Sequence, residues 1–101
     1  MKSVSDIQKL ENVAFVLKTI AHPMRIGIIE LLTKNDKLSV NKICEMLGSE
    51  QSLTSHHLSN MKFKGILSSE REGKNIFYSL KLTEVTKVIS CMEHCDMSQF
   101  S

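Results

Sequence analysis

The chain has 101 residues, of which 42% are hydrophobic and 24% are charged, and its formal net charge at pH 7 is +2. This length predicts a single domain over residues 1–101 with a small core. The lack of a long apolar run or signal peptide predicts a soluble cytoplasmic protein without a membrane partner. Aromatic residues make up only 5% and tryptophan is absent, which argues against a base-stacking surface for single-stranded nucleic acid.

Two helices are predicted in the first third of the chain. From Ile7 to Ile20 apolar residues recur at helical spacing, and the apolar face they form is wider than one small core needs. This face could pack within its own subunit or contact a partner, and the sequence leaves both alternatives open. Pro23 is tolerated in the first turn of a second helix, because its missing N–H would have no partner there. The inward side of that helix is expected to carry Met24, Ile28, Leu31 and Leu32.

A helix–turn–helix is predicted next. Ser39 can cap a third helix, and Gly48 can end it in the left-handed conformation. A polar fourth helix follows from about Gln51 to Lys64. Its inward residues are expected to be Leu53, Leu58 and Met61. Its first turns carry small hydrogen-bonding side chains, where base edges in a major groove would lie. The residues expected to face that groove are Gln51, Ser52, Thr54, Ser55 and His56.

A two-stranded hairpin is predicted after these helices. Residues 66–71 and 75–80 read as strands on either side of Glu72, Gly73 and Lys74, and the second strand alternates apolar and other side chains. Arg71 and Lys74 lie near the tip, where cations suit phosphates. Thr83 can then cap a last helix. The predicted fold is therefore mainly α with a small β-hairpin, a winged helix-turn-helix in which four helices precede two strands and a fifth helix follows.

This order of elements resembles the ArsR/SmtB family of winged-helix repressors. Residues 20–26 (IAHPMRI) look like the family's L-A-x-P-x-R segment, and residues 51–58 (QSLTSHHL) look like its recognition motif Q-S-x-x-S-x-H-L. Residues 65–67 (GIL) and 72–80 (EGKNIFYSL) resemble its A-G-L-V and wing motifs. The resemblance implies a homodimer joined by the first and last helices, double-stranded operator DNA with two inverted half-sites, and repression relieved by a ligand. Two recognition helices can enter successive major grooves only if the protein has matching two-fold symmetry.

The three cysteines are expected to differ in role. An odd number without a signal peptide argues against a secreted disulfide framework. The family's Cys-x-Cys site on the third helix would fall on Ser39 and Asn41, so that site is not expected, and Cys44 is interpreted as a buried free cysteine. The family's last-helix site would fall on Leu82, Glu84, Cys95 and Ser98. Leu82 cannot ligate, so the usual zinc site is not expected there either.

Three alternatives remain for the last helix. Cys91, His94 and Cys95 can share one helical face with Glu84. Their soft donors suit a thiophilic metal or metalloid ion as a cofactor, with a further ligand from a second copy. Cys91 and Cys95 could instead sense oxidants or persulfides, although an intact helix aims an i, i+4 pair poorly for a disulfide. In the third alternative these cysteines only pack at the dimer contact.

An enzyme is not expected. His56 and His57 with Cys44 could suggest a base and a nucleophile. However, adjacent helical residues point about 100° apart, and no glycine-rich phosphate loop or carboxylate pair is seen. The expected function is a transcriptional repressor. The remaining alternative is an inducer-independent winged helix that binds DNA or only protein, and salt dependence distinguishes these two ligands, because only DNA binding should weaken steeply with salt.

Overall fold

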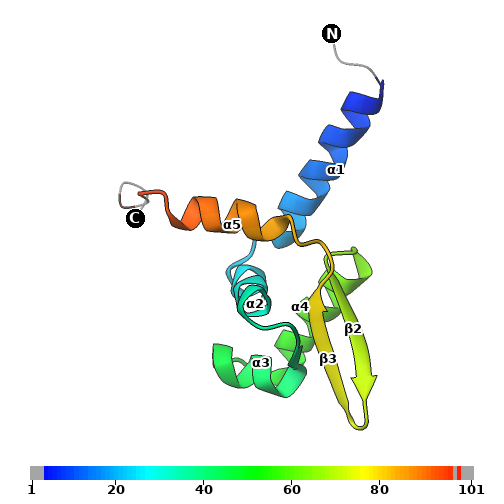
Figure 1. Cartoon of the computed structure of the whole chain (residues 1–101), viewed down its shortest axis with the longest axis vertical. Coiled ribbons are helices and arrows are strands. Elements are labelled where there is room, and N and C mark those ends of the chain that lie inside the picture. Colours follow the sequence, from blue (N-terminus) through cyan, green and yellow to red (C-terminus); the bar gives the residue numbers. More distant parts are fainter. Residues whose placement is uncertain (1–3, 97, 99–101) are drawn as a thin grey trace.

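Five helices and a small antiparallel sheet form the fold in the computed structural model, which describes residues 4–96 and 98 (Figure 1). The order of helices and hairpin strands agrees with the prediction. The elements are α1 (Val4–Ile20), α2 (Pro23–Lys34), β1 (Leu38–Ser39), α3 (Val40–Leu47), α4 (Gln51–Phe63), β2 (Leu67–Glu72), β3 (Asn75–Leu80) and α5 (Val85–Glu93). None of the described helices is long and apolar enough to span a membrane.

Local capping signals set the bounds of α2 and α3. The His22 ring accepts a hydrogen bond from the backbone N–H of Met24 (Nδ1 to N, 3.1 Å), and Pro23 takes the first helical position. The Ser39 hydroxyl accepts from the backbone N–H of Lys42 at 3.1 Å. Gly48 ends α3 with φ of +63°, a conformation that favours glycine. Three of these signals, Pro23, Ser39 and Gly48, were readable in the sequence, and the predicted start of α2 and both predicted ends of α3 are confirmed.

The sheet has the strand order β1-β3-β2, with both pairs antiparallel. Strands β2 and β3 pair from Leu67–Leu80 to Glu72–Asn75, and Gly73 turns the hairpin with φ of +63°. Strand β1 pairs Leu38 with Tyr78, and it was not predicted, because two residues are too short to show a strand pattern. This short strand attaches the start of α3 to the middle of β3, at Phe77 and Tyr78.

A single apolar core joins α2 to the helix–turn–helix, the sheet and α5. Its buried side chains are Ile20, Ile28, Ile29, Leu32, Ile43, Leu58, Met61, Ile66, Leu67, Tyr78, Val85 and Ile89. They come from every helix and from both hairpin strands, so α3 and α4 are held at fixed angles to the wing. Leu53 was expected in this core but is largely exposed. The inward positions of α4 are Thr54, His57, Leu58 and Met61, the spacing of one helical face.

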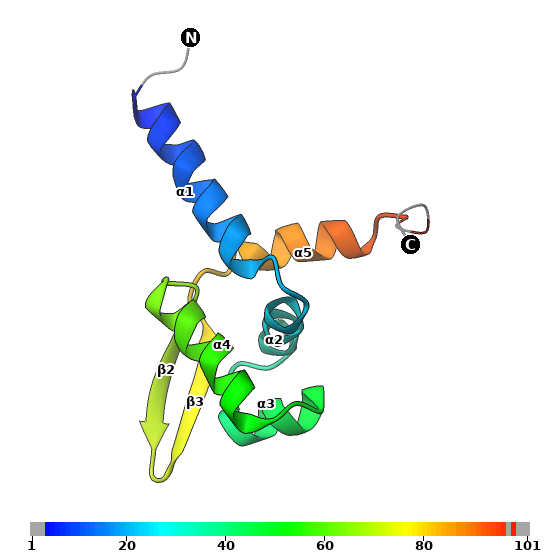
Figure 2. The ribbon, with the colours of Figure 1, turned by 180° about the vertical axis from the view of Figure 1, so that it is seen from behind.

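Helices α1 and α5 leave the body in different directions from a common point above α2 (Figures 1 and 2). Their apolar faces stay exposed in the single chain. Leu10 and Val13 are each 51% exposed, and Val88 is 45% exposed. The radius of gyration is 15.1 Å, larger than the ~13 Å of a compact domain of this length. The wide apolar face predicted for residues 7–20 is therefore left uncovered by its own subunit, except near Val16 and Ile20.

The last helix differs from the prediction at its start. It begins at Val85, after Glu84, with no side-chain cap. Thr83 was expected to cap it, but in the structure its backbone carbonyl accepts bonds from the N–H and the hydroxyl of Thr86 (3.1 and 2.9 Å). A turn therefore precedes the helix where a cap was predicted.

Candidate nucleic-acid interface

The turn between α3 and α4 is short and fixed by hydroxyl groups. Gly48, Ser49 and Glu50 connect the two helices. The Thr54 hydroxyl donates to the Glu50 carbonyl at 3.0 Å, so it accepts from the Ser49 hydroxyl, 2.6 Å away. Thr54 is 0% exposed. The prediction that Thr54 faces a DNA groove is therefore wrong, because its side chain is used to hold the turn against the start of α4.

The other residues predicted for the groove lie on the outer side of α4. Gln51, Ser52 and His56 are exposed and Ser55 is half-buried. Figure 2 shows α4 in front, with the β2–β3 hairpin beside it and α3 below. The outer side of α4 is thus free to approach a ligand together with the hairpin tip.

A polar hollow of about 160 Å³ lies between α3, α4 and the wing. Its lining residues are Val40, Asn41, Gln51, Ser55, Lys74, Asn75 and Ile76. The hollow brings Gln51 and Ser55 of α4 together with Lys74 of the wing, although these positions are about 20 residues apart in sequence. It is smaller than the roughly 300 Å³ of ordinary small-molecule sites, so it is a notch in a larger surface. Asn41 and Asn75 also line the hollow, and neither was predicted from the sequence to contact DNA.

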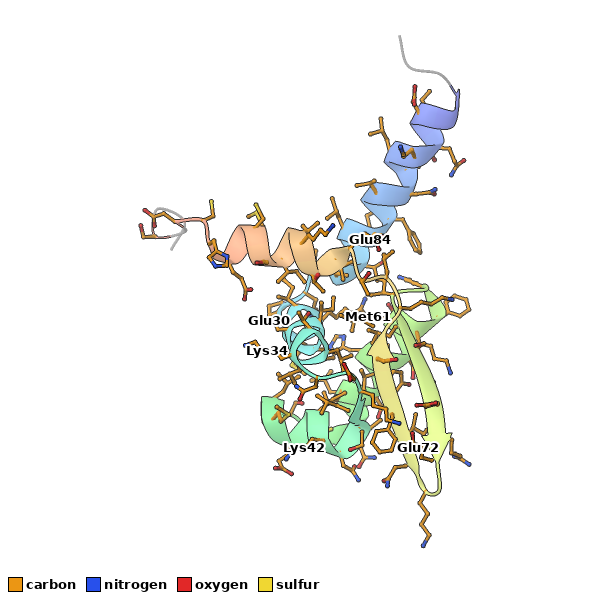
Figure 3. All side chains as sticks on the ribbon, in the orientation of Figure 1. Glu30, Lys34, Lys42, Met61, Glu72 and Glu84 are labelled. Atoms are coloured by element: carbon orange, nitrogen blue, oxygen red, sulfur yellow. The ribbon has the colours of Figure 1, made fainter. Side chains whose placement is uncertain are left out.

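Lys37 controls the charge of the wing, although no local pattern in the sequence indicates this role. Its ammonium pairs with Glu70 at 3.1 Å and with Glu72, and it lies 5.2 Å from the centre of the Phe77 ring. The hydrogen bond to Glu72 and then that to Glu70 raise the pKa of Lys37, and the bond from Lys37 lowers the pKa of Glu72. Figure 3 shows Glu72 near the lower end of the hairpin. Lys37 therefore offsets two carboxylates that would otherwise repel phosphates.

Arg71 and Lys74, the two cations predicted for phosphate contacts, are exposed at the end of the hairpin. Within the described part of the chain neither forms an ion pair. Their charges are thus available to a polyanion, in contrast to that of Lys37.

The end of α5 does not gather the predicted ligand set. The helix stops at Glu93, and both the backbone N–H and the ring of His94 contact the Ser90 carbonyl (3.2 and 2.7 Å). Cys95 lies beyond the helix, so the prediction that Cys91, His94 and Cys95 share one helical face is wrong for Cys95. All three are exposed and both thiols are free. Among residues 4–96 and 98 of one chain, no three His, Cys, Asp or Glu side chains lie close enough to hold a metal ion.

The remaining candidate residues are also separated. Cys44 is half-buried in α3 and free. Glu84, which directly precedes α5, borders an apolar hollow of about 280 Å³ between α1 and α5 (Figure 3 labels Glu84). Glu93, the last residue of α5, contacts Glu30 of α2, and the hydrogen bond between these two carboxyl groups raises the pKa of Glu93. A second apolar hollow of about 470 Å³ lies on the other side of the junction, between Leu17, Ile20, Val88 and Met92.

The chain is similar in sequence and in fold to known bacterial regulatory proteins. The family model described as "Bacterial regulatory protein, arsR family" matches residues 22–69, from the start of α2 into β2. The chain is 38% identical to the transcriptional repressor PagR of Bacillus anthracis, over 86% of this chain and 87% of PagR. The crystal structure of PagR superposes with a TM-score of 0.76 over 85% of this chain and 98% of that one.

Two further similar proteins have names that state a metal or an assembly. The cadmium resistance transcriptional regulatory protein CadC of Listeria innocua is 29% identical over 81% of this chain and 66% of CadC. The homodimeric winged helix-turn-helix DNA-binding domain of Mb0332 from Mycobacterium bovis is 25% identical and has a TM-score of 0.76, over 91% of this chain and 84% of that one.

Proposed function

We propose that this chain, which belongs to the arsR family of bacterial regulatory proteins, binds operator DNA as a homodimer, represses transcription there and releases the DNA when Cys91 and Cys95 react with an inducer. Family membership makes the chain a DNA-binding transcriptional regulator with a winged helix-turn-helix fold. PagR is named as a repressor, which supports repression as the direction of regulation. The assignment of bases, phosphates, dimer contacts and inducer to particular residues is the proposal.

The observation that carries the DNA-binding role is the shared notch between α4 and the wing. Gln51 and Ser55 would meet base edges, with Ser52 and His56 beside them on the same exposed side. Lys74 also lines that notch. An orientation of the protein that places α4 in a major groove therefore also brings the wing to the adjacent DNA backbone. Arg71 and Lys74 would contact phosphates, which position the protein without reading sequence.

The homodimer would be built from α1 and α5. In one chain these helices expose Leu10, Val13, Leu17, Val88 and Met92, and two apolar hollows lie at their junction. Contiguous exposed apolar surface of this kind marks an interaction site. A second copy fits the surface because a palindromic operator requires two-fold symmetry. The homodimeric Mb0332 domain, which shares this fold, supports the same arrangement.

Base reading by α4 is tested with an operator obtained by selection from random duplexes. A Ser55→Ala, His56→Ala double variant should lose preference for the operator over random DNA, since each good base contact contributes ~1–3 kcal/mol. Its affinity for random DNA should change little. Fluorescence anisotropy with both duplexes measures the two affinities. An unchanged operator preference in the double variant would contradict this placement of α4.

The inducer we propose is a thiophilic metal or metalloid ion. Cys91 and Cys95 are exposed free thiols at the end of α5, and thiolates prefer such ions. Within the part of one chain that the structure describes, three ligands do not come together, so the remaining ligands would come from the same segment of the second copy. Coordination across the dimer would then favour one angle between the subunits, which requires unequal affinity of the ion for two dimer states. The name of CadC supports a metal as inducer.

Thiol oxidation is the second candidate, and the early end of α5 favours it. Cys95 lies outside the helix, so the poor aim of an i, i+4 pair in an intact helix does not apply to it. An oxidised form of Cys91 and Cys95 could therefore form without unwinding a turn of α5. Both candidates use the same two thiols, and they differ in the reagent that releases the DNA.

The experiment titrates zinc, copper(I), arsenite and a persulfide donor against the operator complex. The parent should lose operator affinity about a hundredfold with one of these reagents, which corresponds to a coupling of ~2.7 kcal/mol. The Cys91→Ser, Cys95→Ser protein should retain the DNA, and a Cys44→Ser control should behave as the parent. If parent and double variant respond alike to every reagent, the two cysteines are not the sensor.

A further inference from the structure

One side chain, Arg25 of α2, connects the end of α1 to the recognition helix. Its Nε donates to His57 Nδ1 at 3.0 Å, and its Nη1 donates to Asn60 Oδ1 at 2.8 Å. The same Nη1 donates to the backbone carbonyl of Thr19 at 2.9 Å. Thr19 lies one residue before the end of α1, and His57 and Asn60 lie on α4. Two elements with different proposed roles, dimer contact and base reading, thus share one guanidinium.

His57 must be neutral to take part in this connection. Its Nδ1 accepts a hydrogen bond from Arg25, so the ring proton resides on Nε2. That Nε2 is buried and has no partner among the described residues, and the side chain is only 5% exposed. The charged or titratable groups that act on His57 are His22, Arg25 and His56. The ring centres of His22 and His56 lie 4.5 and 5.7 Å, respectively, from that of His57. Burial first, and then these neighbours, lower the pKa of His57.

The bonds fix the rotation of α4 about its own axis. His57 and Asn60 are three residues apart, so they lie on one side of the helix, and both are held by Arg25. Successive residues of a helix differ by about 100° in direction. Holding His57 inward therefore sets where Ser55 and His56 point on the outer side. Any rotation of α4 would move both candidate base-reading side chains together.

We propose that Arg25 is a positioning residue for operator recognition, holding α4 at the rotation needed for base reading through a neutral His57. The proposal deepens the proposed function and rests on it. Arginine suits the role because its planar group can donate in several fixed directions at once. A lysine keeps the charge but presents one compact ammonium, which cannot reproduce bonds to two side chains and a carbonyl in the same geometry.

The first test replaces Arg25 conservatively. An Arg25→Lys variant should bind the selected operator about tenfold or more weakly, as expected for loss of hydrogen bonds to a charged donor. Its affinity for random duplex should stay close to that of the parent. The matched control is Lys34→Arg, the opposite exchange at the far end of the same helix, where Lys34 is exposed (Figure 3). Circular dichroism confirms that each protein is folded at the assay temperature. Full operator preference in folded Arg25→Lys protein overturns the proposal.

The second test uses pH and a variant that cannot titrate. Asparagine at position 57 can keep an acceptor close to the position of Nδ1 but takes up no proton. In the parent, the ratio of operator to random-DNA affinity should fall as the pH is lowered below 6.5, because the pKa of His57 in the folded protein lies below that ordinary value. In His57→Asn the ratio should hold over that range. Because both proteins retain His56 and His22, the difference between them isolates His57. Identical profiles overturn the proposal.

A spectroscopic readout separates this proposal from the proposed function. In the DNA-free protein, nitrogen-15 shifts should show His57 Nδ1 unprotonated in the parent and a mixed tautomer in Arg25→Lys. If the shifts behave so but Arg25→Lys keeps its operator preference, positioning is overturned while operator binding stands. If the parent itself prefers no DNA sequence, the proposed function fails and this proposal fails with it. If Arg25→Lys does not fold, the parent and His57→Asn pH profiles decide alone.

Discussion

Neighbouring residues in the first turns of α4 have opposite tasks. Thr54 is fully buried and its hydroxyl joins Ser49 to the Glu50 carbonyl, whereas Ser55 borders the notch beside Lys74. Their side chains are chemically similar, so composition alone could not separate them. The direction of each side chain relative to the core decides which one is structural and which one can reach DNA.

Replacing Thr54 should affect stability and not sequence preference. In Thr54→Val the Ser49 hydroxyl loses its acceptor inside the turn, which should lower the free energy of unfolding by ~1–3 kcal/mol. Ser55→Ala should leave that free energy nearly unchanged and reduce operator preference. Urea unfolding and DNA anisotropy on both variants measure the two effects. The opposite pattern, with Thr54→Val altering only DNA preference, would contradict the assignment of the two residues.

The lowered pKa of His57 makes stability depend on pH. The ordinary pKa of histidine is 6.5, and the folded value lies below it. As the pH falls through 6.5, His57 binds a proton in the unfolded chain before it does so in the folded protein. The stabilisation that is present above pH 6.5 is therefore lost as the pH falls from 6.5 to the folded pKa. The free energy of unfolding should therefore decrease between pH 7.5 and 5, and less so in His57→Asn. Urea midpoints at several pH values measure this, and an equal decrease in both proteins would speak against it.

At the scale of elements, the wing is a nearly neutral hairpin whose cations are made available by Lys37. Lys37→Met should free the Glu70 and Glu72 carboxylates and weaken binding to operator and random DNA alike by several-fold at low salt. Lys81→Met is the control, since Lys81 follows β3 at the end opposite the tip. Equal effects of the two substitutions would mean that only net charge matters.

Arg71 and Lys74 should act through phosphates. Replacing either by alanine should weaken binding to operator and to random DNA to a similar degree. It should also reduce the slope of log affinity against log salt concentration by about one unit per lost contact. Anisotropy titrations at a series of salt concentrations give this slope. A loss confined to the operator would instead assign these residues to base reading.

The sequence was informative wherever structure depends on local signals. Pro23, Ser39 and Gly48 predicted the start of α2 and both ends of α3, and the alternation of residues 75–80 predicted β3. Features that depend on distant contacts were missed. Arg25 and His57 are 32 positions apart, and Lys37 and Glu70 are 33 apart, so nothing local marks either pair. The burial of Thr54 in place of Leu53 was missed because a polar helix has a weak apolar pattern.

At the scale of the whole molecule, the exposed faces of α1 and α5 are expected to join two copies. Val88→Glu should weaken the dimer strongly, because it places a charge in the proposed apolar contact, while the monomer should still fold since Val88 is 45% exposed there. Phe63→Lys is the control, as Phe63 is 89% exposed at the far end of α4. Sedimentation equilibrium of both variants measures the association. A monomeric parent at micromolar concentration, or a Phe63→Lys protein that dissociates as readily, would refute this interface.

The central claim is that two copies of α4 and its wing read a symmetric operator. Selection of the parent protein against a pool of random duplexes tests it most directly. The selected sequences should contain an inverted repeat whose half-site centres lie about 10 base pairs, one helical turn, apart. Affinity for this repeat should fall steeply with salt while exceeding that for random DNA. Recovery of no common sequence, or of a single half-site without its inverted partner, would contradict the account.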